Sequence, residues 1–341
     1  MIADFRSDTL TMPTDEMRKV MAEASLGDDV FMEDPSINAL EEKVAAMFGM
    51  EAAIFCPSGT MTNQIAIKLH TRPGDELICD QNSHIYLYEG GGIAANSGVQ
   101  VQLVNGDRGR INLNQVKALV KADDPHFPNT SLVCTENTSN KGGGSIYRLE
   151  DLKDLSNFCR NQGLAFHLDG ARVFNAINEA NYGAKDLGQL YDSISVCFSK
   201  GLGAPVGSAL ISTKANIHKA RRIRKSLGGG MRQAGMLAAA ASFALDHHVD
   251  RMKEDHKRAK LLESELNEID WIKNIAPVET NIVVIEIDER YPSTELIEAL
   301  KQENVLAVNF GLQKIRLVTH LDIDDSRTQM AISAFNNISL S

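Results

Sequence analysis

The stretch that decides the fold is DSISVCFSKGLGAPVGSALIS, residues 192–212. Its two short apolar runs, residues 193–198 and 208–212, are typical of strands buried on both faces of a sheet. The connection between them is too short to hold a crossover helix, so we expect the two strands to pair antiparallel. Lys200 lies in this connection, directly after the first strand and before a glycine-rich turn.

A second apolar run lies upstream, in GLAFHLDGARVFNA, residues 163–176, and Asp169 closes it. The carboxyl ends of parallel strands form the ligand crevice of an α/β sheet. An amine at such a place can form a Schiff base with an aldehyde cofactor, and an acid can keep a ring nitrogen protonated. Lys200 and Asp169 together therefore predict pyridoxal 5'-phosphate (PLP) as the cofactor.

The rest of the chain alternates between strand-like runs and helical patterns. This alternation predicts an α/β fold whose large domain contains a mostly parallel seven-stranded sheet with helices on both faces. The seven expected strands are residues 52–56, 76–79, 99–104, 131–135, 164–168, 193–198 and 208–212.

The pattern changes after a long helical region at residues 231–266. Beyond it we expect a small α+β domain. The boundary is placed inside the helical region, so that residues 1–250 form the large PLP-binding domain and residues 251–341 the small C-terminal domain. The expected small-domain elements are strands at 281–287 and 314–319 and helices at 294–302 and 325–336.

Composition narrows the class of protein. The 341 residues are 43% hydrophobic and 23% charged, with a net charge of −10. Acid spread along the chain argues against nucleic acid or an anionic membrane as partner. The first residues show no apolar signal core, so we expect a cytoplasmic protein. The five cysteines show no metal-binding or CxxC spacing and are expected to be buried apolar residues.

Ser58-Gly59-Thr60 follows a predicted strand and precedes a predicted helix. The unpaired N–H groups and the positive dipole end of a helix N-terminus suit a phosphate. The alternative is an ordinary helix cap, because Ser and Thr begin many helices. The presence of Lys200 and Asp169 favours the phosphate.

Two other chemistries are weighed against this hypothesis. GLGAPVG, residues 201–207, superficially resembles a dinucleotide fingerprint, but that fingerprint must lead from a strand into a helix, and here Pro205 and a following strand prevent it. His167 and Asp169 alternate on one strand and can face the same side, but no third metal ligand is apparent, so His167 is interpreted as a core or supporting residue. We expect no metal.

Three more polar residues are candidates by position. His84 comes directly after a predicted strand, where an imidazole can stack on a cofactor ring. Arg172 lies three residues past Asp169 and can reach a cofactor oxygen or a substrate carboxylate. His126 lies in a proline-flanked loop and is the weakest of the three on sequence grounds.

The chain as a whole resembles the low-specificity L-threonine aldolases of the fold-type-I, aspartate aminotransferase-like PLP enzymes. The likeness covers essentially the whole chain and rests on long blocks in the family's order. These are DFRSDTLTMPTDEMR (4–18), GDDVFMEDPSINALE (27–41), FCPSGTMTNQ (55–64), SHIYLYEGGG (83–92), CTENTSNKGGG (134–144), HLDGARVFNA (167–176), SVCFSKGLGAPVGS (195–208), RRIRKSLGGGMRQAG (221–235) and IRLVTH (315–320).

The resemblance implies a role for each matching residue. It makes Lys200 the Schiff-base lysine, Asp169 the partner of the ring nitrogen and His84 the histidine stacked on the ring. The other implied roles are phosphate contacts at Gly59 and Thr60, cofactor and carboxylate contacts at Arg172, substrate carboxylate contacts at Ser7 and Arg316, a contact with the substrate hydroxyl at His126, and basic groups lent across a subunit boundary at Lys225 and Arg232.

The activity that the resemblance implies is retro-aldol cleavage of L-threonine or L-allo-threonine to glycine and acetaldehyde, by a homotetramer built from close dimers. Such a lyase would serve threonine catabolism and glycine biosynthesis. The general base stays open among His84, His126 and a bound water. The alternatives are another fold-type-I PLP enzyme, such as an aminotransferase or an amino-acid β-lyase, and a non-enzymatic PLP-binding protein.

Overall fold

The computed structural model describes residues 1–338, so the last three residues of the expected small domain lie outside the described chain. Its largest element is a seven-stranded sheet in the order β2-β8-β7-β6-β5-β3-β4. Only β8 runs antiparallel to its neighbours β2 and β7, which confirms the mostly parallel sheet and its antiparallel final pair. The strands are β2 (Ala52–Cys56), β3 (Glu76–Asp80), β4 (Gln100–Val104), β5 (Thr130–Glu136), β6 (Ala165–Gly170), β7 (Ser193–Cys197) and β8 (Ser208–Ser212).

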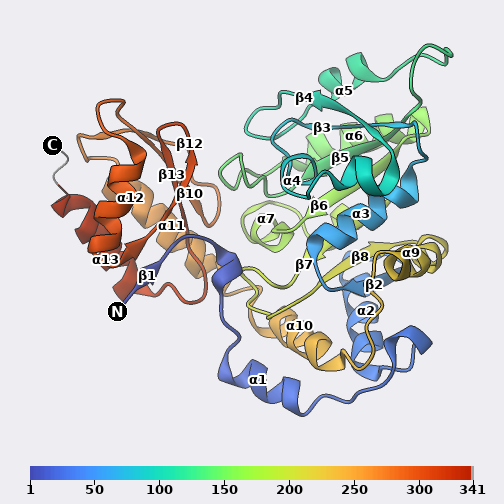
Figure 1. Ribbon diagram of the computed structural model, residues 1–341, viewed down its shortest axis with the longest axis horizontal. Coiled ribbons are helices and arrows are strands. Elements are labelled where there is room, and N and C mark those ends of the chain that lie inside the picture. The colour runs from blue at the N-terminus through green and yellow to red at the C-terminus, as the bar shows by residue number, and fades with distance from the viewer. Residues whose placement is uncertain (339–341) are drawn as a thin grey trace.

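Helices cover both faces of this sheet (Figure 1). α3 (Gly59–His70) and α9 (Lys214–Ser226) pack on one face through a cluster that includes Ile65 and Ile217. The other face carries the largest hydrophobic core of the chain. The helices that contribute buried side chains to it are α1 (Asp15–Ala22), α2 (Pro35–Phe48), α5 (Leu113–Leu119), α6 (Leu149–Gln162), α7 (Val173–Glu179), α8 (Ala184–Gly188) and α10 (Gly235–His247). No helix within residues 1–338 is both long and apolar enough to span a bilayer.

A smaller antiparallel sheet, in the order β12-β13-β10-β9, forms the core of the C-terminal part. The sequence predicted two of its strands, β10 (Ile282–Ile287) and β13 (Lys314–Val318), and missed the short β9 (Ile272–Ile275) and β12 (Val308–Gly311). Three helices complete it: α11 (Met252–Leu266), α12 (Ser293–Gln302) and α13 (Asp325–Asn337). The long helical region expected at 231–266 is two helices, α10 and α11, interrupted near Asp250.

The first residues of the chain belong in space with the small C-terminal sheet (Figure 1). β1 (Ala3–Asp4) pairs parallel with β11 (Val305–Leu306), and Ala3 and Phe5 are buried in the small-domain core. The N-terminal segment then crosses to the large domain. A division of the chain at residue 250 stays a prediction, and it does not anticipate this N-terminal strand.

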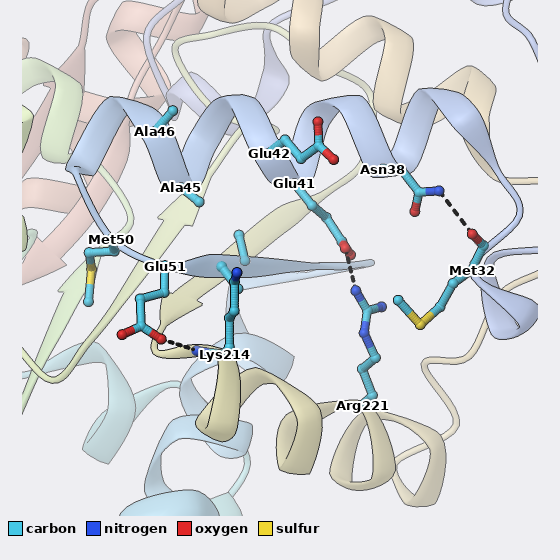
Figure 2. A pocket seen from close by; sticks show the side chains of 12 residues that line it. Met32, Asn38, Glu41, Glu42, Ala45, Ala46, Met50, Glu51, Lys214 and Arg221 are labelled. Carbon is cyan, nitrogen blue, oxygen red and sulfur yellow. Dashed lines mark hydrogen bonds and ion pairs between the residues drawn. The ribbon is translucent and has the colours of Figure 1, made fainter.

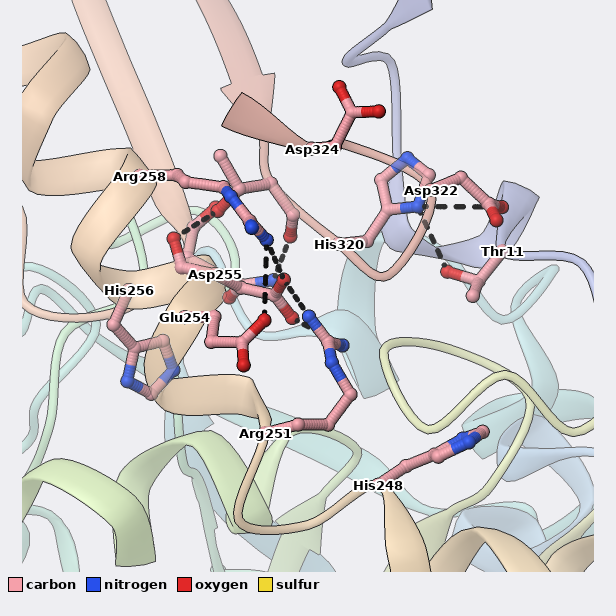
Figure 3. A network of polar contacts seen from close by, with 12 residues as sticks. Thr11, His248, Arg251, Glu254, Asp255, His256, Arg258, His320, Asp322 and Asp324 are labelled. Atoms are coloured by element: carbon pink, nitrogen blue, oxygen red, sulfur yellow. Dashed lines mark hydrogen bonds and ion pairs between the residues drawn. The ribbon is translucent and has the colours of Figure 1, made fainter. Parts of the chain in front are cut away.

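Polar contacts join the N-terminal segment to His320, which follows β13, and join the turn after Lys200 to His248, which precedes α11 (Figure 3). His320 lies 3.2 Å from the hydroxyl of Thr11 through Nδ1 and 3.0 Å from the carbonyl of Asp4 through Nε2. On the other side, His248 donates through Nδ1 to the carbonyl of Leu202 at 2.7 Å. The turn that follows Lys200 is thereby fixed to the junction between α10 and α11.

The free edge of β2 is capped by side chains in a groove between α2 and α9 (Figure 2). Glu41 accepts from the backbone N–H of Phe55 at 2.8 Å and from Arg221 at 2.5 Å, while Arg224 donates to the carbonyl of Phe55 at 2.7 Å. Burial raises the pKa of Glu41 despite these partners. Two arginines of the basic segment 221–225, Arg221 and Arg224, therefore bind partners within their own chain.

Candidate active site

Two adjoining cavities lie at the carboxyl ends of the central strands. The inner cavity, about 160 Å³, and the outer cavity, about 340 Å³, share Thr9, His84 and Lys200. The other residues that line the inner one are Ser58, Gly59, Thr60, Asn63, Asp169, Ala171, Cys197 and Ser199. The outer one is also lined by Ser7, Tyr88, Asn140, Lys141, Arg172, Val308, Asn309, Phe310 and Arg316.

Lys200 and Asp169 are brought together because Asp169 lies near the end of β6 and Lys200 follows the neighbouring strand β7. β6 and β7 pair in parallel, with Asp169 opposite Ser195, so both chains leave the sheet at the same edge. The Asp169 carboxylate is 2% exposed and accepts from the Asn63 amide at 2.9 Å and from the Ala171 N–H at 3.1 Å. A buried carboxylate aimed into a cavity can hold a positively charged ring nitrogen.

His167 lies behind this carboxylate rather than in the cavity. Its Nε2 contacts the Asn63 carbonyl at 3.2 Å, and its Nδ1 contacts the Ser193 hydroxyl at 2.8 Å. Complete burial lowers the pKa of His167 to about 4, so the ring is neutral near pH 7. The structure therefore places His167 as a buried supporting residue, the interpretation drawn from the sequence because no third metal ligand was apparent.

The predicted phosphate end of the site is the N-terminus of α3. Ser58 caps this helix through a hydrogen bond from the Met61 N–H to its side chain at 3.2 Å. Ser58, Gly59 and Thr60 all line the inner cavity. The capped helix N-terminus therefore faces the inner cavity, so the helix-cap interpretation and the predicted phosphate contact do not exclude each other.

A second acid, Glu136, lies beside Asp169 and was missed by the sequence interpretation. The two residues are register partners on β5 and β6. Burial, reinforced by the charge of Asp169, raises the pKa of Glu136 to about 7. Its carboxyl group accepts from the backbone N–H groups of His84 and Asn140, each at 2.8 Å. The signal that identified Asp169, an acid closing an apolar run, is also present at Glu136.

The outer cavity carries a surplus of positive charge. Arg172 is paired with Asp8, but Arg316 has no carboxylate within 4.0 Å among residues 1–338. Arg316 donates to the side-chain oxygen of Asn140 at 2.7 Å and to the carbonyl of Arg6 at 2.9 Å. Burial, and then the nearby Arg172, lowers the pKa of Arg316 to about 10. A negatively charged group in the cavity would offset the free-energy cost of burying the Arg316 charge. Ser7 also lines this cavity.

Three predicted residues are not brought to the cavities within one chain. The His126 side chain is 85% exposed, in the loop before β5, and contacts Asp124 at 2.7 Å. Arg232 is exposed and pairs with Asp28 at 2.9 Å, and Lys225 is exposed at the end of α9. Neither cavity is lined by any of the three. Their roles stay predictions.

Among residues 1–338, possible metal ligands meet where His84, Glu89 and Asp169 have ligand atoms within 4.8 Å of one another. The Asn63 amide nitrogen donates to Glu89 at 2.8 Å and to Asp169 at 2.9 Å. Its hydrogens therefore lie between the two carboxylates, where a cation would have to bind. His84, Glu89 and Asp169 are therefore interpreted as members of a hydrogen-bonded array around Asn63, and we propose no metal there.

Several other cavity residues escaped the sequence interpretation. Thr9 is two residues from the predicted Ser7, and Ser199 precedes Lys200, so both could have been found as neighbours of predicted residues. Phe310 gave no signal, because it lies on the short strand β12 that the sequence analysis missed. Its ring lies 4.1 Å from the Lys141 ammonium and 5.0 Å from the Arg316 guanidinium.

The donor set fits PLP. The inner cavity offers an amine at Lys200 for an aldehyde, a buried carboxylate at Asp169 for a ring nitrogen, and a helix N-terminus for a phosphate. The imidazole of His84 lies at the boundary with the outer cavity. The fold and this site define the class as an aspartate aminotransferase-like PLP enzyme of fold type I.

Comparison with known proteins gives the family. The model for beta-eliminating lyases matches residues 4–290. The chain is 41% identical to the low specificity L-threonine aldolase of Escherichia coli K12, over 96% of each chain, and 40% identical to the low-specificity L-threonine aldolase 1 of Arabidopsis thaliana, over 99% of this chain and 96% of that one. The chain belongs to the low-specificity L-threonine aldolase family, whose members are PLP-dependent lyases.

Solved structures confirm the fold. A threonine aldolase from Leishmania major superposes with a TM-score of 0.85 at 21% identity, covering 98% of both chains. An aspartate aminotransferase from Thermotoga maritima superposes with a TM-score of 0.76 at 14% identity, covering 99% of this chain and 92% of that one.

Proposed function

We propose that this chain cleaves L-threonine and L-allo-threonine to glycine and acetaldehyde with PLP as cofactor. The observation that carries this proposal is that the cavity with Lys200 and Asp169 shares Thr9, His84 and Lys200 with the cavity that contains Arg316. The first cavity suits the cofactor and the second suits the carboxylate of an amino acid. Family membership supports the same reaction.

Lys200 would hold the aldehyde end of the cofactor, Asp169 its ring nitrogen, and Ser58, Gly59 and Thr60 its phosphate. When bound, PLP supplies an electron-accepting ring that stabilises the negative charge left on Cα after the Cα–Cβ bond breaks. Asp169 favours the positively charged ring nitrogen on which this stabilisation depends.

Ser7, Arg172 and Arg316 would hold the substrate carboxylate. Holding the carboxylate fixes the rotation about the bond between Cα and the amino nitrogen. This rotation decides which of the other bonds of Cα is aligned for cleavage. Arginine suits this role because its planar group can bind a carboxylate with two parallel hydrogen bonds. The proton of the β-hydroxyl must also leave. Of the two predicted histidines, His84 lines both cavities and His126 lines neither, which favours His84 or a water bound to it.

We further propose a homotetramer built from close dimers, in the cytoplasm, with no nucleic-acid or membrane partner. The proposal is supported by Lys225 and Arg232, two exposed basic residues that flank Gly228-Gly229-Gly230 and line neither cavity of their own chain. Light scattering tests the assembly, and a fully active monomer would contradict the proposed role of these basic residues.

The experiment that tests the reaction is incubation of the PLP-loaded protein with threonine, allo-threonine and serine in separate reactions. We expect equimolar glycine and acetaldehyde from the first two. The competing assignments are an aminotransferase, favoured by the fold, and an amino-acid β-lyase, favoured by the beta-eliminating lyase match. An aminotransferase requires an added oxo acid, and a β-lyase releases ammonia and an oxo acid instead of glycine.

A further inference from the structure

Glu89 is a fully buried carboxylate that the proposed reaction does not use. It follows the short helix α4 (His84–Leu87), and its side chain has no exposed surface. Its Oε1 lies 2.8 Å from the Asn63 amide nitrogen and 3.1 Å from His84 Nδ1, and its Oε2 accepts from the Gln64 amide at 2.7 Å. Two of these three partners, Asn63 and His84, line the inner cavity, and Gln64 holds the carboxylate from behind.

These contacts decide how the His84 ring is protonated. A carboxylate only accepts hydrogen bonds, so the 3.1 Å contact requires a hydrogen on His84 Nδ1. In the neutral ring, Nε2 is then a free acceptor. Since His84 lines both cavities, the tautomer set by Glu89 determines what the ring offers there.

Asn63 connects this pair to the acid of the inner cavity. One amide nitrogen donates to Glu89 at 2.8 Å and to Asp169 at 2.9 Å, and the amide oxygen lies 3.2 Å from His167 Nε2. Asn63 is 1% exposed, so its orientation is fixed by these partners. Asp169, Asn63, Glu89 and His84 thus form one continuous hydrogen-bonded array.

We propose that Glu89 is a positioning residue: it fixes the ring orientation and the Nδ1–H tautomer of His84, and Asn63 holds it in register with Asp169. The orientation and tautomer of His84 are inferred from the hydrogen-bond geometry alone. The consequence of this orientation for catalysis rests on the proposed aldolase function. The arrangement follows the general pattern in which a buried carboxylate orients a functional histidine.

The charged groups around His84 agree with this role. Burial lowers the pKa of His84, but the hydrogen bond from the ring to Glu89 and the charge of Asp169 outweigh it, so the net pKa is raised. Lys200 acts in the opposite direction. Glu136 contacts only the backbone N–H of His84, and the Tyr88 ring lies 5.7 Å from the imidazole.

The first test needs no cofactor. In cofactor-free protein with ring-¹⁵N histidine, His84 is assigned from the signals that His84→Phe removes and is titrated by NMR. Glu89→Gln should lower the His84 pKa by at least about half a pH unit and reduce the Nδ1–H population. Asp124→Asn is the matched control, because it removes the carboxylate beside another histidine ring, His126, and should leave the His84 signals unchanged. An unaltered His84 titration in Glu89→Gln would overturn the proposal, whether or not the protein cleaves threonine.

The second test is a double-mutant cycle on threonine cleavage. Glu89→Gln should lower kcat/KM at least about tenfold and shift its pH profile when His84 is present, but less than about twofold in a His84→Phe background. Equal losses in both backgrounds would mean that Glu89 acts elsewhere, and would overturn the proposal even with the aldolase function intact. Absence of glycine formation in the unaltered protein would instead reject the aldolase function.

Discussion

Arg172 donates two hydrogen bonds of 2.7 Å to the carboxylate of Asp8, and both side chains are buried although the residues lie 164 positions apart. Burial alone would raise the pKa of Asp8, but Arg172 outweighs it and holds this pKa well below its usual range. The pair uses Nε and Nη2 of Arg172, so Nη1 is left for a ligand. The N-terminal segment is thereby fixed to the wall of the active site.

Asp8→Asn should destabilise the fold, because a buried arginine loses its counter-charge. We expect a loss of about 3 kcal/mol in the free energy of unfolding. Asp151→Asn is the control, since Asp151 binds Arg148 through the same two nitrogens on an exposed surface. That change should cost less than about 1 kcal/mol. Denaturant unfolding of both variants measures the difference, and equal losses would contradict a structural role for the buried pair.

Lys200→Ala should abolish covalent attachment of the cofactor. Lys200 is the amine of the inner cavity, where the aldehyde end would lie. The unaltered protein, loaded with PLP, should show a visible absorbance band that borohydride removes, with the label retained on the peptide that contains residue 200. A Lys200→Ala protein that still retains a borohydride-fixed cofactor would refute the assignment.

Asp169→Asn should lower kcat at least tenfold while the protein stays folded. Asparagine keeps the shape and the bond to the Ala171 N–H but loses the negative charge that favours a protonated ring nitrogen. A charged hydrogen bond contributes about 1.5–3 kcal/mol, which corresponds to at least a tenfold change in rate. Steady-state kinetics and the melting temperature check this together, and near-normal turnover in folded protein would be inconsistent with the role.

Arg316→Lys should raise KM for threonine and lower kcat/KM with little change in melting temperature. Lysine keeps the charge but lacks the planar donor pair that binds a carboxylate. Arg290→Lys is the control, because Arg290 is an exposed arginine of the small domain, paired with Asp288. A marked fall in Tm with an unchanged KM would identify Arg316 as a structural residue instead, through its bond to Asn140.

His167 should make the stability of the cofactor-free protein fall at acid pH. Its pKa is lowered to about 4 by burial, whereas an unfolded chain gives about 6.5. Between these values the unfolded state binds more protons, so stability decreases as pH falls from about 6.5 to 4, by on the order of 3 kcal/mol. His167→Gln cannot bind this proton and should show a flatter profile in denaturant unfolding. Parallel profiles for the two proteins would refute the prediction.

The sequence by itself determined the strands of the large sheet, and it predicted Lys200 and Asp169 as the central residues of the proposed site. Strands buried on both faces consist mostly of apolar and small residues, so they remain visible as short runs such as residues 193–198. Lys200 and Asp169 could be found because each directly follows such a run. Edge and surface strands lack this constraint, which is why β9 and β12 went unseen.

Only the tertiary structure decided which distant residues meet. The insertion of β8 between β7 and β2, the pairing of β1 with β11, and the contact of Asp8 with Arg172 leave no local pattern in the sequence. The array of Glu89, Asn63 and Asp169 likewise depends on α3 packing against both α4 and β6. Local sequence patterns indicate which single segments are buried. The geometry of the site depends instead on how those segments pack, because a hydrogen bond near 3 Å forms only when the backbones that carry donor and acceptor are both held in place.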